Sequence, residues 1–174
     1  SRAMTWDAAS AYGAHAEQAV AAPRPEWLLA EGATHSGFQL FYLLQNPGPE
    51  ASDVEVRYLR PTPLPPVAKR YRLEPTSRRT IWVNHEDPGL AATDVSAVLA
   101  SLDQRPFVVE RAMYLDRGGQ VYAAGHAGAG LASPHDEWLL AEGATGPLFD
   151  LFVLVANPGP TSAEVESRYL LPDG

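Results

Sequence analysis

Short apolar runs separated by turn residues dominate the chain and predict strands rather than helices. Residues 38–45 are apolar at nearly every position, which is typical of a strand buried on both faces. In residues 53–58, apolar and charged positions alternate, as in a half-exposed strand. Further strands are expected over residues 69–73, 80–83, 107–113 and 120–124.

Proline and glycine mark the boundaries of these strands. Asn46-Pro47-Gly48-Pro49 predicts a turn, because proline fixes φ and glycine accepts positive φ. Gly118-Gly119 predicts a hairpin turn. The proline-rich stretch 61–66 predicts a stiff connector, extended or polyproline-like.

Residues 94–102 allow two interpretations. Val95, Val98 and Leu99 fit a helical stripe with Asp94 as the N-cap. Alternation of Val95, Ala97 and Leu99 fits a strand equally well. Because the neighbouring segments are strands, we favour a strand.

An internal repeat organises the chain. Residues 27–34 recur letter for letter at 138–145, and 22 of the 35 pairs between 27–61 and 138–172 are identical. The N-terminal part echoes a later segment as well. Arg2-Ala3-Met4 matches residues 111–113, and His15-Ala16 matches residues 126–127.

The repeat divides the chain into three parts. We expect residues 1–25 to be the closing strands of a preceding repeat, 26–133 to be one complete repeat, and 134–174 to be the opening strands of a following repeat. Eight or nine short strands in about 110 residues predict an all-β fold, an antiparallel β-sandwich repeat module. The two chain ends would form an out-of-phase partial second repeat, either within one molecule or between molecules.

Composition narrows the class of protein. The apolar content of 45% and the charged content of 20% are typical of a globular protein. A net charge of −8 argues against nucleic acid as a partner, because binding to phosphates needs a basic face. The chain has no cysteine, which excludes disulfides and thiolate metal sites, and no apolar run long enough for a membrane span.

Three blocks of sequence resemble a family of repeat domains. Trp27–Thr34 fits its Trp-x-x-Ala-Glu-Gly-x-Thr block, Ser77–Asn84 reads Ser-Arg-Arg-Thr-Ile-Trp-Val-Asn, and Glu110–Tyr114 reads Glu-Arg-Ala-Met-Tyr. The chain is similar to this poorly characterised family in predicted extracellular proteins of actinobacteria and related bacteria. The resemblance implies tandem β-sandwich modules on secreted or cell-surface proteins, and it implies no known chemistry.

No motif predicts catalysis. Glu31 and its copy Glu142 are the most conspicuous acids, and hydrogen bonding to backbone or pairing with an arginine is their expected role. Ser36 lacks a nucleophile-elbow pattern and its copy is Pro147. Gly125–Gly130 lacks the Gly-Lys-Ser/Thr of a phosphate-binding loop, so we expect a flexible or bulged link between modules.

Two groups of residues are candidate metal ligands. Asn84, His85-Glu86-Asp87 and Asp94 could supply oxygen ligands to Ca²⁺, but their spacing is not that of an EF-hand, and a solvated loop is favoured. His15 and His126 recur in the repeat, and a structural role is favoured over metal ligation. We predict no resident metal or cofactor.

Aromatic and basic residues are the candidate ligand or interface contacts. Trp27, Trp82 and Trp138 could stack on sugars if they are exposed, although a core or module-interface role suits the repeated pair better. Arg78 and Arg79 belong to a basic cluster with Lys69, Arg70 and Arg72, which could contact a polyanion or simply be solvated.

Together these observations predict a non-enzymatic structural or assembly module of a tandem-repeat extracellular or cell-surface protein. Its expected partners are neighbouring repeats or copies of itself, joined by strand addition. A carbohydrate- or cell-wall-binding β-sandwich module, with a glycan as partner, is the alternative.

Overall fold

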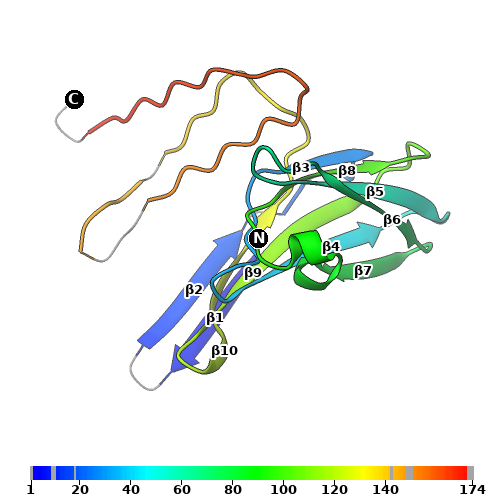
Figure 1. Cartoon of the computed structure of the whole chain (residues 1–174). Coiled ribbons are helices and arrows are strands. Elements are labelled where there is room, and N and C mark those ends of the chain that lie inside the picture. The colour runs from blue at the N-terminus through cyan, green and yellow to red at the C-terminus, as the bar shows by residue number, and fades with distance from the viewer. Residues whose placement is uncertain (1, 9–10, 18, 142, 148–150, 172–174) are drawn as a thin grey trace.

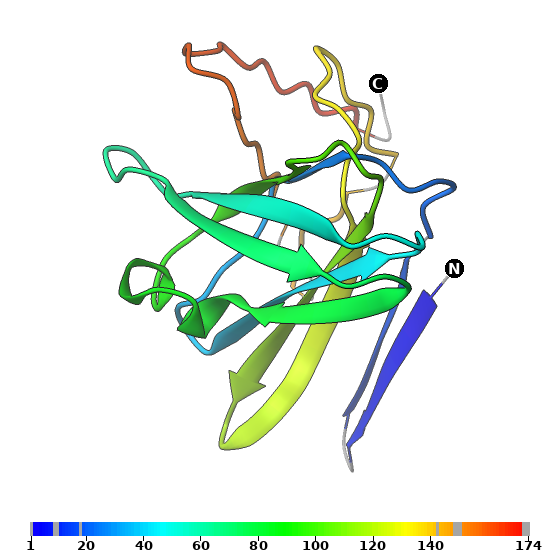
Figure 2. The ribbon, with the colours of Figure 1, turned by 90° about the vertical axis from the view of Figure 1, so that its right-hand side faces the viewer.

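Two four-stranded antiparallel sheets, packed face to face, form the body of the protein (Figures 1 and 2). The computed structural model describes residues 2–8, 11–17, 19–141, 143–147 and 151–171. One sheet has the order β10-β9-β4-β7 and consists of β10 (Gln120–Ala129), β9 (Val108–Arg117), β4 (Phe38–Asn46) and β7 (Ser77–Trp82). The other has the order β3-β8-β5-β6 and consists of β3 (Glu26–Leu29), β8 (Ser96–Ser101), β5 (Ser52–Leu59) and β6 (Val67–Leu73). The predicted all-β sandwich is confirmed.

Alternation of apolar and polar positions sets the buried face of β5. Val54, Val56 and Tyr58 are fully buried between the sheets, whereas Asp53 and Arg57 are exposed. A strand with this pattern buries one face and leaves the other in water.

The predicted burial of residues 38–45 on both faces was wrong. In β4, Leu40, Tyr42 and Leu44 are fully buried, but Phe41 between them is only half-buried. The outer face of this sheet borders solvent, and neighbouring aromatic rings cover it in part. The apolar residues on that face therefore form a surface layer rather than a second core.

Aromatic side chains join the two sheets through the core. The rings of Tyr42 in β4 and Tyr58 in β5 stack with centroids 5.9 Å apart and an interplanar angle of 10°. Trp27 in β3 is buried, and its Nε1 donates a hydrogen bond to the carbonyl oxygen of Phe107 at 2.8 Å. Full burial of one large apolar side chain stabilises a fold by roughly 1.5–3 kcal/mol, so each of these buried rings contributes to holding the sheets together.

The ambiguous segment 94–102 contains a strand, as favoured. β8 lies between β3 and β5, and Leu99 is in register with Trp27 on one side and Val56 on the other. A helix at this position would leave the backbone of both neighbouring strands without partners. Two short 3₁₀ helices, η1 (Val83–His85) and η2 (Pro88–Leu90), precede β8.

The two predicted turns are confirmed. Gly118 and Gly119 have φ values of 62° and 81° and close the β9–β10 hairpin, a conformation that glycine adopts at no steric cost. In the turn after β4, the Oδ1 of Asn46 accepts a hydrogen bond from the Gly48 N–H at 3.0 Å. The Nδ2 of Asn46 donates to the carbonyl oxygen of Glu50 at 2.7 Å.

The proline-rich connector differs from the extended segment expected. Its backbone turns, with the N–H of Leu64 donating to the carbonyl oxygen of Pro61 at 3.0 Å. The guanidinium of Arg60 holds the turn by donating twice to the carbonyl oxygen of Pro65, at 2.9 and 2.7 Å. The reason is topological: β5 and β6 are antiparallel neighbours, so their connector must reverse direction.

The glycine-rich stretch 125–130 is also not the flexible or bulged link that was expected, because β10 extends to Ala129. Its glycines leave room for large neighbours. A Cβ at Gly128 would lie 3.2 Å from Nη2 of Arg111, and one at Gly130 would lie 3.0 Å from Cε3 of Trp27. Small residues are thus needed here for close packing rather than for flexibility.

The two ends of the chain adopt different states. The N-terminal end forms a separate two-stranded hairpin, β1 (Arg2–Ala8) and β2 (Ala11–Glu17), beside the sandwich. At the other end, Leu131 exchanges two backbone hydrogen bonds of 2.8 Å with Leu28, and the described residues beyond it form no strand. In both ribbon views the hairpin and the C-terminal segment project from the sandwich in different directions.

Candidate assembly interface

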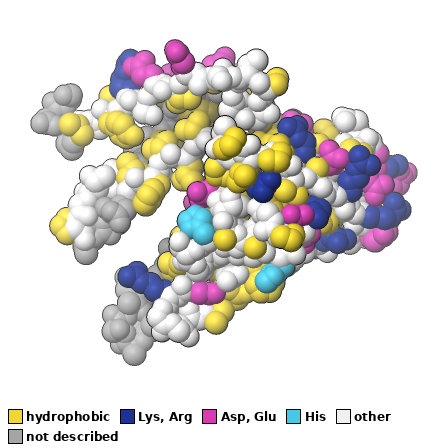
Figure 3. Space-filling view, viewed as in Figure 1, with side chains coloured by type: hydrophobic (Ala, Val, Ile, Leu, Met, Phe, Trp, Pro, Cys, Tyr) yellow, Lys and Arg dark blue, Asp and Glu magenta, His cyan; other side chains and the backbone are white. Residues whose placement is uncertain are grey.

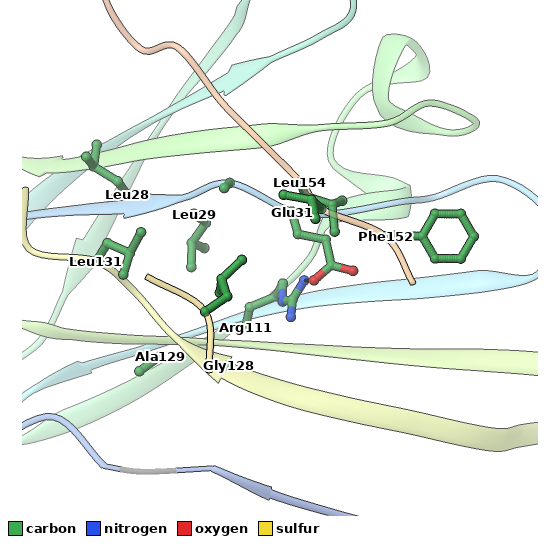
Figure 4. Close-up of a pocket in the computed structure, with 12 residues that line it drawn as sticks. Leu28, Leu29, Glu31, Arg111, Gly128, Ala129, Leu131, Phe152 and Leu154 are labelled. Atoms are coloured by element: carbon green, nitrogen blue, oxygen red, sulfur yellow. Dashed lines mark hydrogen bonds and ion pairs between the residues drawn. The ribbon is translucent and has the colours of Figure 1, made fainter. Parts of the chain in front are cut away.

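A charged cluster joins the opening and closing strands of the complete unit. Glu31 follows β3, Arg111 lies in β9 and His126 lies in β10. The Nη1 of Arg111 donates to Oε2 of Glu31 (Figure 4). The Nη2 of Arg111 donates to Nδ1 of His126 at 3.0 Å. The Nε2 of His126 lies 3.6 Å from Oε1 of Glu31, so each of the three side chains contacts the other two.

The cluster keeps Glu31 ionised. Burial alone would raise the pKa of this carboxyl, but the hydrogen bond from His126 and the charge and hydrogen bond of Arg111 lower it to about 2. The guanidinium of Arg111 is buried, and a buried charge needs such a partner. The pairing of Glu31 with an arginine is the structural role expected from the sequence. Its copy, Glu142, lies outside the described residues.

The N-terminal hairpin packs against the sandwich through a histidine of the repeat. His15 in β2 places its Nε2 2.5 Å from the carbonyl oxygen of Ala127 in β10. The rings of His15 and His126 meet edge to face, with centroids 5.6 Å apart. These histidines occupy the same position in two hairpins of similar sequence, so the contact joins the two copies of that sequence.

The N-terminal hairpin reproduces the register of β9–β10. Met4 pairs with His15 and Ala3 with Ala16, as Met113 pairs with His126 and Ala112 with Ala127. The two hairpins differ in their other neighbour. β9 pairs with β10 on one edge and with β4 on the other, whereas β1 pairs only with β2 among the described residues.

The two copies of the opening segment differ sharply in burial. Trp27 is 2% exposed and its copy Trp138 is 54% exposed. Leu44 is fully buried and its copy Val155 is 62% exposed. The other core positions of β3, β4 and β5 follow the same pattern, with buried Leu29, Leu40, Val54 and Tyr58 matched by exposed Leu140, Leu151, Val165 and Tyr169. Figure 3 shows hydrophobic side chains exposed along this segment.

The local turn of the repeat nevertheless forms in both copies. The Oδ1 of Asn157 accepts from the Gly159 N–H at 3.0 Å, and its Nδ2 donates to the carbonyl oxygen of Thr161 at 2.6 Å. These are the hydrogen bonds that Asn46 makes in the first copy. The second copy therefore has the local structure of the unit without the long-range pairing of its strands.

A hollow of about 330 Å³ separates the C-terminal segment from the complete unit (Figure 4). Leu29, Glu31 and Arg111 line one side, and Phe152 and Leu154 line the other. Its walls combine one ion pair with exposed apolar side chains. The arrangement suits contact between polypeptide segments better than recognition of a small polar ligand.

The three tryptophans proposed as ligand contacts lie in different environments. Trp27 belongs to the core, so its ring is not accessible to an external ligand. Trp138 is exposed and meets His135 edge to face, with ring centroids 5.0 Å apart. Trp82 is also exposed, and its Nε1 donates to Oε1 of Gln39 at 3.0 Å.

Trp82 belongs to an aromatic layer on the outer face of the β10-β9-β4-β7 sheet. Its ring stacks on Phe41 with centroids 5.4 Å apart. Tyr114 and Tyr122 also meet Phe41, at 5.9 and 6.3 Å. Within this layer, Trp82 and Tyr122 are the exposed rings.

The two candidate arginines point to different surroundings. Arg78 is exposed and donates to Oγ1 of Thr80 at 3.3 Å. The guanidinium of Arg79 lies over the ring of Tyr71, 5.1 Å from its centroid. The hydroxyl of Tyr71 in turn donates to Oε2 of Glu86 at 2.7 Å. The structure thus does not bring the two guanidinium groups together into one anion site.

The residues weighed as Ca²⁺ ligands make bonds within the fold. Asn84 accepts from the Leu40 N–H at 2.9 Å and donates to the carbonyl oxygen of Phe38 at 2.8 Å. Asp94 pairs with His35 at 2.9 Å. Among the described residues, no group of three or more histidine or acidic side chains could hold a metal ion.

Sequence reasoning missed Arg111 as the centre of the charged cluster. A signal was present, because Arg111 and His126 are both repeated near the N-terminus as Arg2 and His15, and Glu31 is repeated as Glu142. Side chains that recur together in separate segments of a repeat are candidates for mutual contact. That comparison would have found the cluster.

Comparisons with known proteins support the fold and nothing finer. No protein-family model matches the chain, and no curated protein sequence matches it. The structure is similar to the crystal structure of Thermotoga maritima 1070, with a TM-score of 0.55 and 17% identity over 66% of this chain and 97% of the other. It is also similar to the Anabaena sensory rhodopsin transducer, with a TM-score of 0.44 and 22% identity over 53% of this chain and 99% of the other. In the described residues, no helix is long and apolar enough to cross a membrane.

Proposed function

We propose that this chain is a non-enzymatic assembly module of a tandem-repeat protein on the bacterial cell surface or outside the cell. In this proposal, successive units are joined by strands that complete one another's sandwiches. The extracellular location follows from the family resemblance, and the assembly role follows from the repeat and from the exposed state of its second copy.

One observation is the main support for this function: the same sequence is buried in one copy and exposed in the other. The second copy places Trp138, Leu140, Leu151, Val155 and Tyr169 in water at positions where the first copy builds its core. A continuous apolar segment of this kind marks a surface that is covered in the working state. Because the segment copies strands that are buried in the first copy, strands of another repeat are the partner that this proposal assigns to it.

The contact between His15 and β10 supports a serial arrangement. A hairpin belonging to one unit packs on the equivalent hairpin of the next unit. Repetition of this contact would stack units in one direction, as in other repeat proteins, where each unit contacts chiefly its neighbours.

The experiment that tests the proposal is the solution mass of the chain over a concentration series, measured by light scattering after size exclusion. We expect the mass to rise with concentration. The variant Leu151→Asp/Val155→Asp should stay monomeric, because charged side chains cannot enter a sandwich core without a partner. Both positions are exposed, so the complete unit should unfold at the wild-type temperature.

A matched control is Glu166→Gln, which changes an exposed side chain in the same segment. It should associate like the wild type. A wild-type mass that stays at 18.8 kDa at every concentration would refute the assembly function.

The aromatic layer around Trp82 favours a second candidate function, binding to a glycan of the cell wall. Trp82 and Tyr122 are exposed, and Phe41 orders the Trp82 ring by stacking. The variant Trp82→Ala should then be retained less than the wild type on insoluble cell-wall glycan, whereas Trp138→Ala should be retained like the wild type. Equal retention of both variants and the wild type would exclude this layer as the binding site.

A further inference from the structure

The unpaired edge of β1 is the natural partner of the second copy of β4. In the complete unit, β9 is an interior strand, with β10 on one edge and β4 on the other. β1 is the copy of β9, and among the described residues only β2 pairs with it. β1 therefore exposes the edge that β4 would occupy, and a free edge readily accepts a further strand.

The missing strand is also present in the chain. Residues 149–157 are the copy of β4, and the described part of that range forms no strand. Leu151, Val153 and Val155 correspond to the three fully buried positions of β4, and all three are exposed. The acceptor, β1, thus lacks a strand on one edge, and the donor, the copy of β4, lacks a strand to pair with.

The register of this pairing can be read from the complete unit. There, Leu40 pairs with Met113, Phe41 with Ala112 and Tyr42 with Arg111. Transferring these pairs to the copies sets Leu151 opposite Met4, Phe152 opposite Ala3 and Val153 opposite Arg2. Any shift by one residue would turn the buried face of the donor strand outward.

We propose that Leu151–Val153 of one molecule pairs as an antiparallel strand with Arg2–Met4 of β1 in a second molecule, in this register. The inference rests on the proposed assembly function and names its partner, a second copy of this chain. Two observations favour pairing between molecules. β2, through His15, is the strand of the hairpin that packs on β10, and the C-terminal segment leaves the sandwich in a different direction from the hairpin.

The contact is head to tail. The donor strand and the acceptor edge are different surfaces, so every molecule offers one of each. Such an interface continues into chains or closes into rings, and it does not stop at a two-fold dimer.

Engineered cysteines test the register, and the chain has no cysteine to interfere. Ala3→Cys protein is mixed with Phe152→Cys protein and oxidised, and disulfide-linked dimers are counted on a non-reducing gel. Paired strands hold the two thiols at an effective concentration on the order of millimolar. At about 10 µM protein we therefore expect cross-linking on the order of a hundredfold faster than by random encounter.

Two controls fix the interpretation. Phe41→Cys/Ala112→Cys is the equivalent pair inside the complete unit and should form an intramolecular disulfide, because paired strands bring Cα atoms within disulfide range. Leu151→Cys mixed with Ala3→Cys is out of register by one residue, faces the wrong side and should cross-link slowly. Phe152 is exposed, so its replacement removes no core contact.

Four results would overturn the inference. The mixed pair could cross-link no faster than the out-of-register pair, which would exclude this register. An Ala3→Cys/Phe152→Cys double variant could give only cyclised monomers, which would place the pairing within one molecule. If the mass rises with concentration but the mixed pair does not cross-link, the assembly function stands and this strand pairing fails. If the mass does not rise, the assembly function itself fails.

Discussion

The ion pair between Glu31 and Arg111 makes a definite prediction about pH. Because the folded state lowers the pKa of Glu31 from 4.5 to about 2, the unfolded chain binds this proton first as the pH falls. The stabilisation is therefore complete above about pH 4.5 and is lost as the pH falls towards 2. Its upper bound is about 3 kcal/mol at 1.36 kcal/mol per unit. Since 28% of the side chain is exposed to screening, we expect about 2 kcal/mol.

The variant Glu31→Gln isolates this contribution. Near pH 6, we expect the free energy of unfolding of the wild type to exceed that of the variant. About 2 kcal/mol of this difference between the two proteins depends on pH, and about half of that amount should be lost by about pH 3. The measurement is urea denaturation followed by tryptophan fluorescence, with buried Trp27 as reporter of the core. Glu166→Gln, at an exposed position, should follow the wild type at both pH values. Parallel pH profiles for the wild type and Glu31→Gln would refute the assignment of the lowered pKa to this pair.

Three further substitutions test the fold, each by the same denaturation assay. Tyr42→Phe should raise the free energy of unfolding by about 1 kcal/mol, because the buried hydroxyl of Tyr42 has no hydrogen-bond partner. The residue that copies Tyr42 in the second repeat is already apolar, Val153. A lower free energy of unfolding would show that the hydroxyl is satisfied. Asn46→Ala should cost about 1–2 kcal/mol, whereas Asn157→Ala should leave unfolding of the complete unit unchanged although both side chains make the same turn. Gly130→Val should destabilise by about 1–3 kcal/mol, because even its Cβ would lie 2.8 Å from Cγ1 of Val109 in a packed core, and wild-type stability would contradict the packing described.

Sequence patterns that span only a few residues predicted the local structure correctly. Period-two alternation in 53–58 predicted β5, and Gly118-Gly119 predicted the β9–β10 turn. Both depend on neighbouring residues and on the local geometry of the backbone, which sequence shows directly. The segment 94–102 was assigned correctly only because its surroundings were strands, since its own periodicity fits both structures.

The errors came from contacts between distant residues. The glycines of 125–130 suggested flexibility, but two of them make space for distant side chains. Gly128 leaves room for Arg111, 17 positions earlier in the chain, and Gly130 leaves room for Trp27, 103 positions earlier. The apolar residues of 38–45 suggested burial on both faces, and nothing in that segment shows that one face borders solvent. The cluster of Glu31, Arg111 and His126 likewise joins three separate strands or strand ends.

The repeated segments separate local from long-range determinants within a single chain. Asn46 and Asn157 head the same turn with the same hydrogen bonds, so that part of the structure follows from the local sequence alone. Among the described residues, the strands before and after the turn form only in the first copy, where β9, β7 and β8 are available to pair with them. Since the residues are largely the same, what the second copy lacks is a partner. A segment in that condition is prepared for strand addition, and the edge of β1 is the partner whose sequence it matches.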